Sequence, residues 1–193
     1  MLRRDILKNG FLAAYLTATA SLSLPVRADS TGKVATFSGN ASIKFARALR
    51  LIGREQCIEL ARLLELSANK DEDISLHLRS AGISRSDVVI IADALLSLTR
   101  DEASSLRSFS LSFNPEIGDA GALAIARSLP LTLRELGLVG CRIADRGGEA
   151  LLQWAQQASQ LQMICIEDNR FSQPLRARFQ ALAQRNRSLM VVV

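Results

Sequence analysis

One pattern of nine residues occurs three times between Leu106 and Asn169, and it restricts the fold more than any other feature of the chain. The copies begin at Leu106, Leu133 and Leu161, so the spacing is 27 and then 28 residues. Each copy is apolar at places one, four and six and has Asn or Cys at place nine. A period of this length indicates one supersecondary unit per copy, and such units have to stack on one another to bury their apolar faces.

Each unit is expected to consist of a strand, a turn and a helix. Alternating apolar residues at places four and six are typical of a short strand with one buried face. The residue at place nine suits a tight bend, where a small polar side chain can hydrogen-bond backbone groups of the neighbouring coil. Apolar residues then follow at helical spacing: Leu123, Ile125, Ala126 and Leu129 after the first copy, and Ala150, Leu151, Trp154 and Ala155 after the second.

This pattern resembles the leucine-rich repeat. The repeat length, together with Asp119-Ala-Gly121 and Asp145-Arg-Gly147, which are similar to a D-x-x-G motif, favours the ribonuclease-inhibitor-like subclass. The resemblance implies an α/β solenoid of about five to six repeats, with short parallel strands on a concave side and helices on a convex side. It also implies binding to another protein, but it does not identify that protein.

Weaker copies precede the three clear ones. Residues 73–83 keep the apolar pattern of places four, six, nine and eleven, and a helix is expected from Asp87 to Leu98. Residues 43–48 are interpreted as a more degenerate strand copy, and a helix is expected around Gln56 to Leu66. Its apolar face would comprise Cys57, Leu60, Leu63 and Leu64. Starts near 40, 73 and 106 are further apart than the later ones, so the first two units should carry longer helices or loops.

The first 28 residues have the composition of an export signal. A basic head with Arg3, Arg4 and Lys8 precedes a mildly apolar core, and Val26-Arg-Ala28 is a small-residue cleavage site. The head resembles the bacterial twin-arginine consensus, which predicts a periplasmic or secreted protein with no membrane span after cleavage. A general secretory signal and an uncleaved membrane anchor are the alternatives.

Residues 29–40 are polar and are expected to form a flexible leader. Residues 41–193 would then be one leucine-rich-repeat domain, with degenerate repeats in 41–105 and clear repeats in 106–193. Without the signal the chain keeps 20 of its 24 basic and 18 of its 19 acidic residues, a net charge of about +2. That charge is far from the basic surface of a nucleic-acid-binding protein, so no nucleic acid is expected as a partner.

The sequence contains no Gly-rich phosphate loop, CxxC pair, nucleophile elbow or HExxH helix, so no cofactor, metal or catalytic residue is expected. His77 is the only histidine, and it is interpreted as a solvated side chain of the concave face. Cys141 is expected to be a buried bend residue and Cys57 to pack in a helix. Cys165 lies at an exposed place of its strand and would be a free thiol.

Two further features have a structural and a functional interpretation. Trp154 fits helix packing better than a partner anchor, because its spacing with Ala150 and Leu151 is helical. The Arg-rich segment after residue 173 is an amphipathic final helix whose basic face would be solvated. The closing residues Val191 to Val193 are expected to form an edge strand.

The non-consensus strand places would form the concave surface, and these positions are the candidate partner-binding residues. They comprise His77, Arg79, Arg107, Ser110, Ser112, Phe113, Arg134, Glu135, Val139, Met163, Cys165, Glu167 and Asp168. Their mixed charge fits a protein or peptide partner better than a polyanion. The favoured hypothesis is therefore a non-enzymatic, exported protein-interaction module of unknown oligomeric state. The alternative is an enzyme or cofactor protein exported in its folded form, which only the twin-arginine head supports.

Overall fold

The computed structural model describes residues 40–68 and 73–193. The predicted signal peptide, residues 1–28, lies outside the described residues, as does the predicted leader except for Asn40. The division into leader and repeat domain therefore stays a prediction.

Five short strands form one parallel sheet in the order β1-β2-β3-β4-β5. Each strand returns to the sheet through a helix, because parallel neighbours need a crossover connection. The strands comprise β1 (Ile74–His77), β2 (Leu106–Ser110), β3 (Glu135–Gly137), β4 (Met163–Cys165) and β5 (Met190–Val192). The α/β class and the parallel strands of a small solenoid are thus confirmed.

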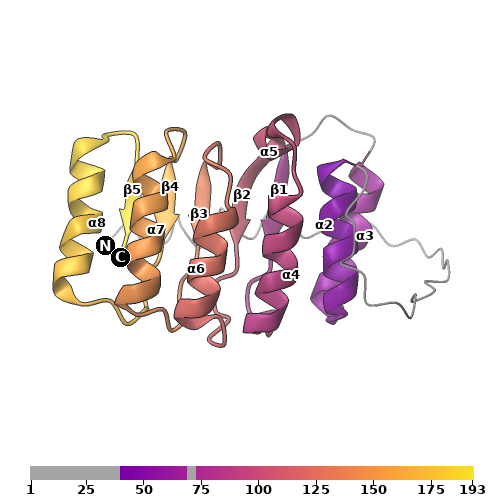
Figure 1. The fold of residues 1–193 in the computed structure, drawn as a ribbon, viewed down its shortest axis with the longest axis horizontal. Coiled ribbons are helices and arrows are strands. Elements are labelled where there is room, and N and C mark those ends of the chain that lie inside the picture. Colours follow the sequence, from indigo (N-terminus) through magenta and orange to yellow (C-terminus); the bar gives the residue numbers. More distant parts are fainter. Residues whose placement is uncertain (1–39, 69–72) are drawn as a thin grey trace, which may run out of the picture. The chain divides into compact units, whose positions relative to one another are not determined.

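The helices between the strands stand side by side over one face of the sheet (Figure 1). They are α4 (Arg85–Leu96), α6 (Gly118–Ser128), α7 (Asp145–Gln157) and α8 (Gln173–Arg185). The apolar side chains at places four and six point towards these helices and form a buried core. In the units of β1 to β4 they are Leu76, Leu78, Phe109, Leu111, Leu136, Leu138, Ile164 and Ile166. The predicted burial of places four and six is confirmed.

Asn114, at place nine, connects two successive coils at the bend after β2. Its side-chain Nδ2 donates hydrogen bonds to the carbonyl oxygens of Leu78 and Leu111, both at 2.8 Å. Its Oδ1 accepts a hydrogen bond from the backbone N–H of Ile83 at 2.9 Å. The amide is fully buried, so these bonds satisfy backbone groups that water cannot reach.

The same place holds Cys141 and Asn169 in the next two units. Asn169 repeats the arrangement of Asn114: its Nδ2 donates to Leu138 O at 2.7 Å, and its Oδ1 accepts from the backbone N–H of Cys141 at 3.1 Å. The Cys141 thiol donates to Leu111 O at 3.3 Å. The predicted role of place nine as a bend that bonds the neighbouring coil is confirmed, and so is the burial of Cys141.

Gly147 allows helix α7 to approach the preceding unit closely. Asp119 accepts hydrogen bonds at Oδ1 from the backbone N–H groups of Ala144 and Gly147, at 2.8 and 2.9 Å. A Cβ on Gly147 would lie 2.8 Å from this oxygen and 2.7 Å from the side chain of Ile143. The Asp-x-Gly segments of the sequence are therefore contacts between successive repeats.

The expected strand copy at residues 43–48 is wrong, because this segment lies within helix α2 (Ala41–Ile52). Asn40 caps the helix by accepting a hydrogen bond from the Ile43 N–H at 3.1 Å. The apolar residues that face the core have helical spacing, namely Ala41, Phe45, Ala48 and Leu49. The alternation of Ile43 and Phe45 resembled a strand only over three residues. The described residues contain five strands, which is within the predicted five to six repeats.

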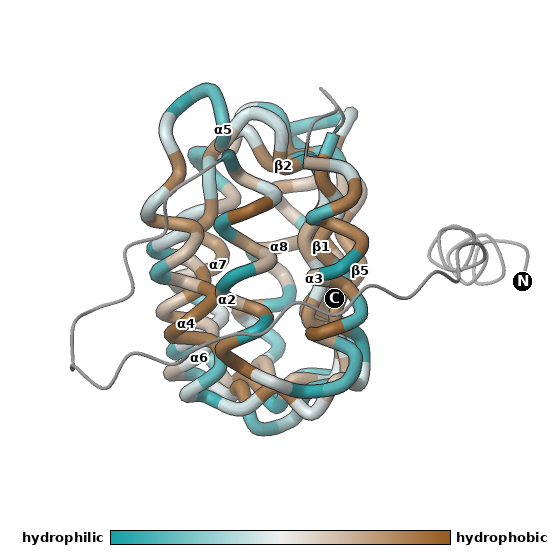
Figure 2. Tube along the Cα trace, turned by 90° about the vertical axis from the view of Figure 1, so that its right-hand side faces the viewer, coloured by the Kyte–Doolittle hydropathy of each residue, from teal (hydrophilic) through white to brown (hydrophobic). Residues whose placement is uncertain are grey.

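Helix α3 (Glu55–Ser67) follows, as predicted for residues 56–66. It buries Cys57, Ala61 and Leu64, whereas Leu63, which was assigned to the apolar face, is 39% exposed. Helix α2 packs on both α3 and α4, so the pair forms the first layer of the described stack. Viewed along the stack, helices α2, α4, α6 and α7 lie on one side and strands β1 and β5 on the other (Figure 2).

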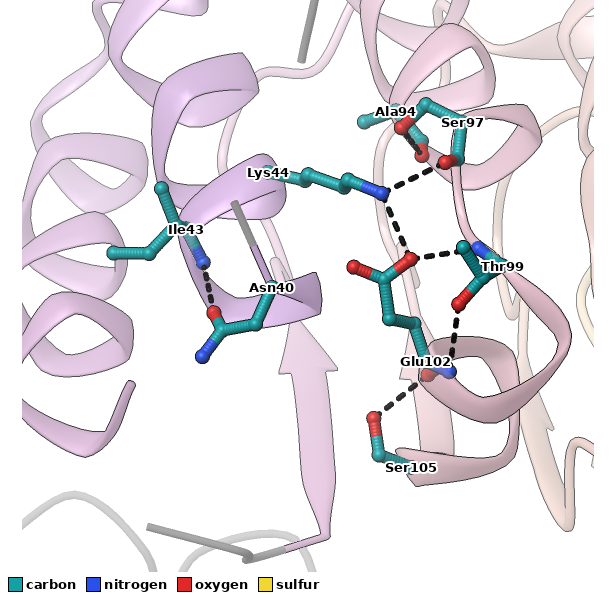
Figure 3. A network of polar contacts seen from close by, with 8 residues as sticks. All are labelled: Asn40, Ile43, Lys44, Ala94, Ser97, Thr99, Glu102 and Ser105. Atoms are coloured by element: carbon teal, nitrogen blue, oxygen red, sulfur yellow. Dashed lines mark hydrogen bonds and ion pairs between the residues drawn. The ribbon is translucent and has the colours of Figure 1, made fainter. Parts of the chain in front are cut away.

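A half-buried ion pair joins this helical pair to the first strand unit (Figure 3). The Lys44 Nζ donates to the Glu102 carboxylate at 2.7 Å and to the Ser97 carbonyl at 2.8 Å. Burial by itself raises the pKa of Glu102, but the hydrogen bonds from Lys44 and Thr99 outweigh it, so this pKa lies below its usual range. The ammonium therefore has two acceptors in a position where an unpaired charge would be costly.

The long spacing between β1 and β2 is explained by an additional short helix, α5 (Arg100–Ser105). Its start is a capping box, in which the Glu102 N–H donates to Thr99 Oγ1 and the Thr99 N–H donates to Glu102. The pattern Thr99-x-x-Glu102 in the sequence indicates the start of this helix. The prediction of longer helices or loops in the first units is confirmed here.

Strand β5 lies at one end of the strand order, as expected for an edge strand. Helix α8 packs over it and buries Leu175 and Phe179. Among residues 40–68 and 73–193, no helix is long and apolar enough to cross a membrane.

We predict that Asn114→Ala lowers the free energy of unfolding by about 3 kcal/mol, because it leaves buried backbone groups of two coils without partners. Cys141→Ala should cost only about 1 kcal/mol, since a thiol is a weak donor. Urea unfolding monitored by circular dichroism measures both. Equal losses for the two variants would contradict the assigned role of the amide.

Candidate functional site

The sheet has a second face, opposite the helices, which we call the open face. It is formed by the residues at places three, five and seven of each unit, together with those at the flanking places two and eight, and no element of the described ranges covers it. The parallel register aligns equal places across the strands. Place three gives the row Ser108, Glu135 and Met163; place five gives His77, Ser110, Gly137 and Cys165; place seven gives Arg79, Ser112, Val139 and Glu167.

Several of these side chains are buried, although their places were expected to be exposed. Ser110 and Ser112 lie with their hydroxyl oxygens 3.2 Å apart, and the Val139 N–H donates to Ser112 Oγ at 3.2 Å. A Cβ on Gly137 would come within 2.6 Å of Ser110 Oγ, so this hydroxyl packs against the glycine backbone. Neighbouring strands are about 4.8 Å apart, and short side chains on them therefore cover one another.

Cys165 was expected to be an exposed thiol, and this prediction is wrong. The side chain is only 6% exposed, because it lies between Gly137 and Val192 in the register. Burial, followed by the carboxylates of Glu167 and Glu135, raises the pKa of the Cys165 thiol to about 12. The nucleophilic thiolate is therefore disfavoured at this position.

The two other cysteines behave as predicted. Cys57 is fully buried in α3 and Cys141 is fully buried at its bend. Burial raises the pKa of each thiol to about 11. All three cysteines are free thiols.

His77 is half-buried and hydrogen-bonded, in contrast to the solvated side chain that was expected. Its Nε2 lies 2.7 Å from Ser108 Oγ on the neighbouring strand. Burial lowers the pKa of His77, and the nearby Glu135 carboxylate opposes this shift in part. A serine next to a histidine is one part of a nucleophilic site, but Ser108 is only 5% exposed. The pair is therefore a packing contact of the open face.

The basic residues of the open face differ in how they are held. Arg107 donates from Nε to the Asp73 carboxylate at 2.8 Å, so its charge is neutralised within the chain. Arg79 is exposed, and its guanidinium carbon lies 3.9 Å from the centre of the Phe113 ring. Neither contact was expected from the sequence, although Asp73 precedes Arg107 by about one repeat, which is a signal of their proximity.

Two polar atoms among the predicted partner-binding residues are buried without a hydrogen-bond partner in the described part of the chain. They are Nε of Arg134, at place two, and Oε2 of Glu167, at place seven. Buried polar groups are normally satisfied, so each exception requires an explanation. The chain itself encloses both atoms, while the two side chains as a whole are only half-buried.

Trp154 belongs to the opposite side of the sheet. It is 4% exposed, and its indole N–H donates to the Leu129 carbonyl at 3.2 Å, which confirms helix packing. A groove of about 370 Å³ runs between α6 and α7 beside it, with apolar and polar walls. Its lining includes Leu123, Leu131, Gln153 and Gln157. No three His, Cys, Asp or Glu side chains of the described ranges come together as a metal site.

We predict that acidification destabilises the native chain more than a His77→Gln variant. As the pH falls through about 6.5, the unfolded chain binds a proton at His77 before the folded chain does, because the folded pKa is lower. The free energy of unfolding therefore falls with the pH. Gln cannot titrate but can still hydrogen-bond Ser108. Urea unfolding between about pH 7.5 and 5 measures the difference, and parallel curves for the two proteins would refute it.

Comparison with known proteins supports the repeat assignment. Residues 102–126 and 130–152 match a family model described as Leucine Rich repeat, which is of the ribonuclease-inhibitor type. The two matched segments begin shortly before β2 and β3 and extend into α6 and α7. No curated protein matches the chain. Residues 102–152 therefore carry leucine-rich repeats.

Proposed function

We propose that this protein is a non-enzymatic interaction module that binds a protein or peptide partner on its open face. Leucine-rich repeats are generally protein-interaction modules. The observation that supports the proposal here is the open face itself, a sheet surface with charges of both signs that no described element covers.

The charge of the open face supports a protein partner over a nucleic acid. Its cations are Arg79, Arg107 and Arg134, and its anions are Glu135, Glu167 and Asp168. Cations and anions are equal in number, and Arg107 is already paired with Asp73. A polyanion requires an excess of unpaired cations on one surface, whereas this face offers both signs next to apolar groups such as Met163 and Phe113.

The short buried side chains give this face a fixed shape. Ser110, Ser112 and Cys165 are held by neighbouring strands, and the strands are positioned by the Asn114 and Asn169 amides behind them. Because these side chains are already held in place, few of them have to be ordered when a partner docks. The entropy cost of binding is therefore reduced.

We expect the double variant Arg134→Glu/Glu167→Arg to bind the partner at least tenfold more weakly than the native chain, because it reverses the charge of two residues of the open face. Arg127→Glu/Asp93→Arg is the matched control: it also leaves the net charge unchanged, but its exposed residues lie on α6 and α4. Affinity capture with each tagged protein from cells that produce it, followed by quantitative mass spectrometry, measures the difference.

A protein retained by the native chain and the control but lost by the open-face variant is the expected result. Equal retention by all three would move the site to the helices and contradict the proposal. Circular dichroism of each variant establishes that it is folded before capture.

We also propose that the chain is exported through a twin-arginine signal in residues 1–28. The residues that support this are Arg3 and Arg4, followed by Ile6, Leu7 and Lys8. Intact-mass spectrometry of the product from a bacterium with this pathway should show loss of residues 1–28. Arg3→Lys/Arg4→Lys should leave the chain at full length. Cleavage of both forms would instead indicate the general secretory route, and cleavage of neither would argue against a signal peptide.

A further inference from the structure

The residues at place eight, which directly follow place seven of the open face, share an unusual backbone conformation. Ser80, Phe113, Gly140 and Asp168 all have positive φ, at 53°, 62°, 63° and 59°. Gly adopts this conformation without strain, and Asp tolerates it better than most residues. A bulky aromatic residue does not, so Phe113 is held at a cost that Gly140 avoids. Strain of this kind concentrates where a side chain has a function.

The Phe113 ring lies between a cation and the backbone of the next unit. Arg79, at the end of β1, stacks over the ring at 3.9 Å from its centre. A Cβ on Gly140, in the next unit, would lie 3.2 Å from the ring Cδ1. The ring therefore fills the space above Gly140 and supports the guanidinium. We call the four residues Arg79, Phe113, Gly140 and Asp168 the rim row, which runs across the strand ends from β1 to β4.

The two ends of the rim row carry opposite charges. At one end, no carboxylate of the described ranges pairs with Arg79, and stacking leaves its N–H groups available in the plane of the guanidinium. At the other end lie Asp168, which is exposed, and Glu167, which is half-buried. Arg107 differs, because Asp73 neutralises it within the chain.

The distance between these ends corresponds to a short stretch of extended polypeptide. The end of β1 and the end of β4 are three strand spacings apart, which amounts to about 14 Å at about 4.8 Å per spacing. An extended chain advances about 3.3 Å per residue, so about four residues cover this distance. A segment that crosses the strand ends could therefore contact both charges at once.

We propose that the rim row binds an extended segment of a protein partner that carries an acidic and a basic side chain about four residues apart. The acidic side chain pairs with Arg79, and the basic one pairs with Glu167 and Asp168. Phe113 pre-orients the guanidinium and provides an apolar contact between the two ion pairs. This inference rests on the proposed function and identifies the chemistry of the partner at that same face.

Selection from a displayed library of random 12-residue peptides tests the inference without a known partner. The full chain and its Arg79→Glu variant serve as targets. Peptides enriched on the native chain should carry an acidic and a basic residue three to five positions apart. Peptides enriched on Arg79→Glu should replace the acidic residue by a basic one. Enriched peptides without such a pair, or the same peptides on both targets, would overturn the inference.

Fluorescence anisotropy with synthetic versions of the enriched peptides measures how much Arg79 and Phe113 contribute to the binding affinity. Arg79→Glu should weaken binding at least tenfold, whereas the control Arg127→Glu on α6 should leave it unchanged. Phe113→Asn relieves the backbone strain, so its Tm should equal or exceed that of the native chain while the affinity falls. Unchanged affinity in Phe113→Asn or Arg79→Glu would contradict the assignment.

The two proposals fail in different ways. If peptides bind the native chain but ignore the rim row, the inference is wrong while the open face remains an interaction surface. If no peptide is enriched on the native chain, and the capture experiment with Arg134→Glu/Glu167→Arg also shows no loss, both are wrong.

Discussion

The fold depends on how the backbone is satisfied at the bends between strand and helix. At each bend the chain leaves the sheet, and its carbonyl and N–H groups face the buried stack, where no water can hydrogen-bond them. Asn114 and Asn169 bond these groups in two successive coils at once. A repeat therefore has complete hydrogen bonding only when its neighbour is in place, and the stability of each unit is tied to the stack.

This constraint also determines the surface on which function is expected. Because the bends hold successive coils in register, equal places of the strands form straight rows on the open face. Close spacing then buries the short side chains of these rows and exposes the longer charged ones. Arg79 and Asp168 remain accessible at the strand ends, while Ser110 and Cys165 become part of the rigid floor.

The first layer of the described stack is completed in a different way. A solenoid cannot expose the core of its first unit, and helix α2 covers it with Phe45 and Leu49. Lys44 anchors this helix to Ser97 and Glu102. The helix replaces a strand copy that local alternation had indicated. A terminal unit has only one neighbour, so its sequence can depart from the repeat pattern. Its structure is therefore the hardest to predict from that pattern.

Much of the architecture follows from the sequence alone, since periodicity reflects burial directly. Places one, four, six and nine of the repeat identify the strands from β1 to β4, the bend at Asn114 and the following helices, because each apolar or amide residue has one environment that suits it. The role of place nine likewise follows from the type of residue at that place. These features needed no knowledge of which residues meet across the sheet.

Only the tertiary structure decided the properties of the open face. Whether a side chain at an outward place is exposed depends on its neighbours on the adjacent strands, which lie about 27 to 34 residues distant in the chain. Hence Cys165 proved buried, His77 proved bonded to Ser108, and Arg107 proved neutralised by Asp73. The stack of Arg79 on Phe113 is of the same kind. Sequence determines which face a residue occupies, whereas packing between coils determines what that residue can still bind.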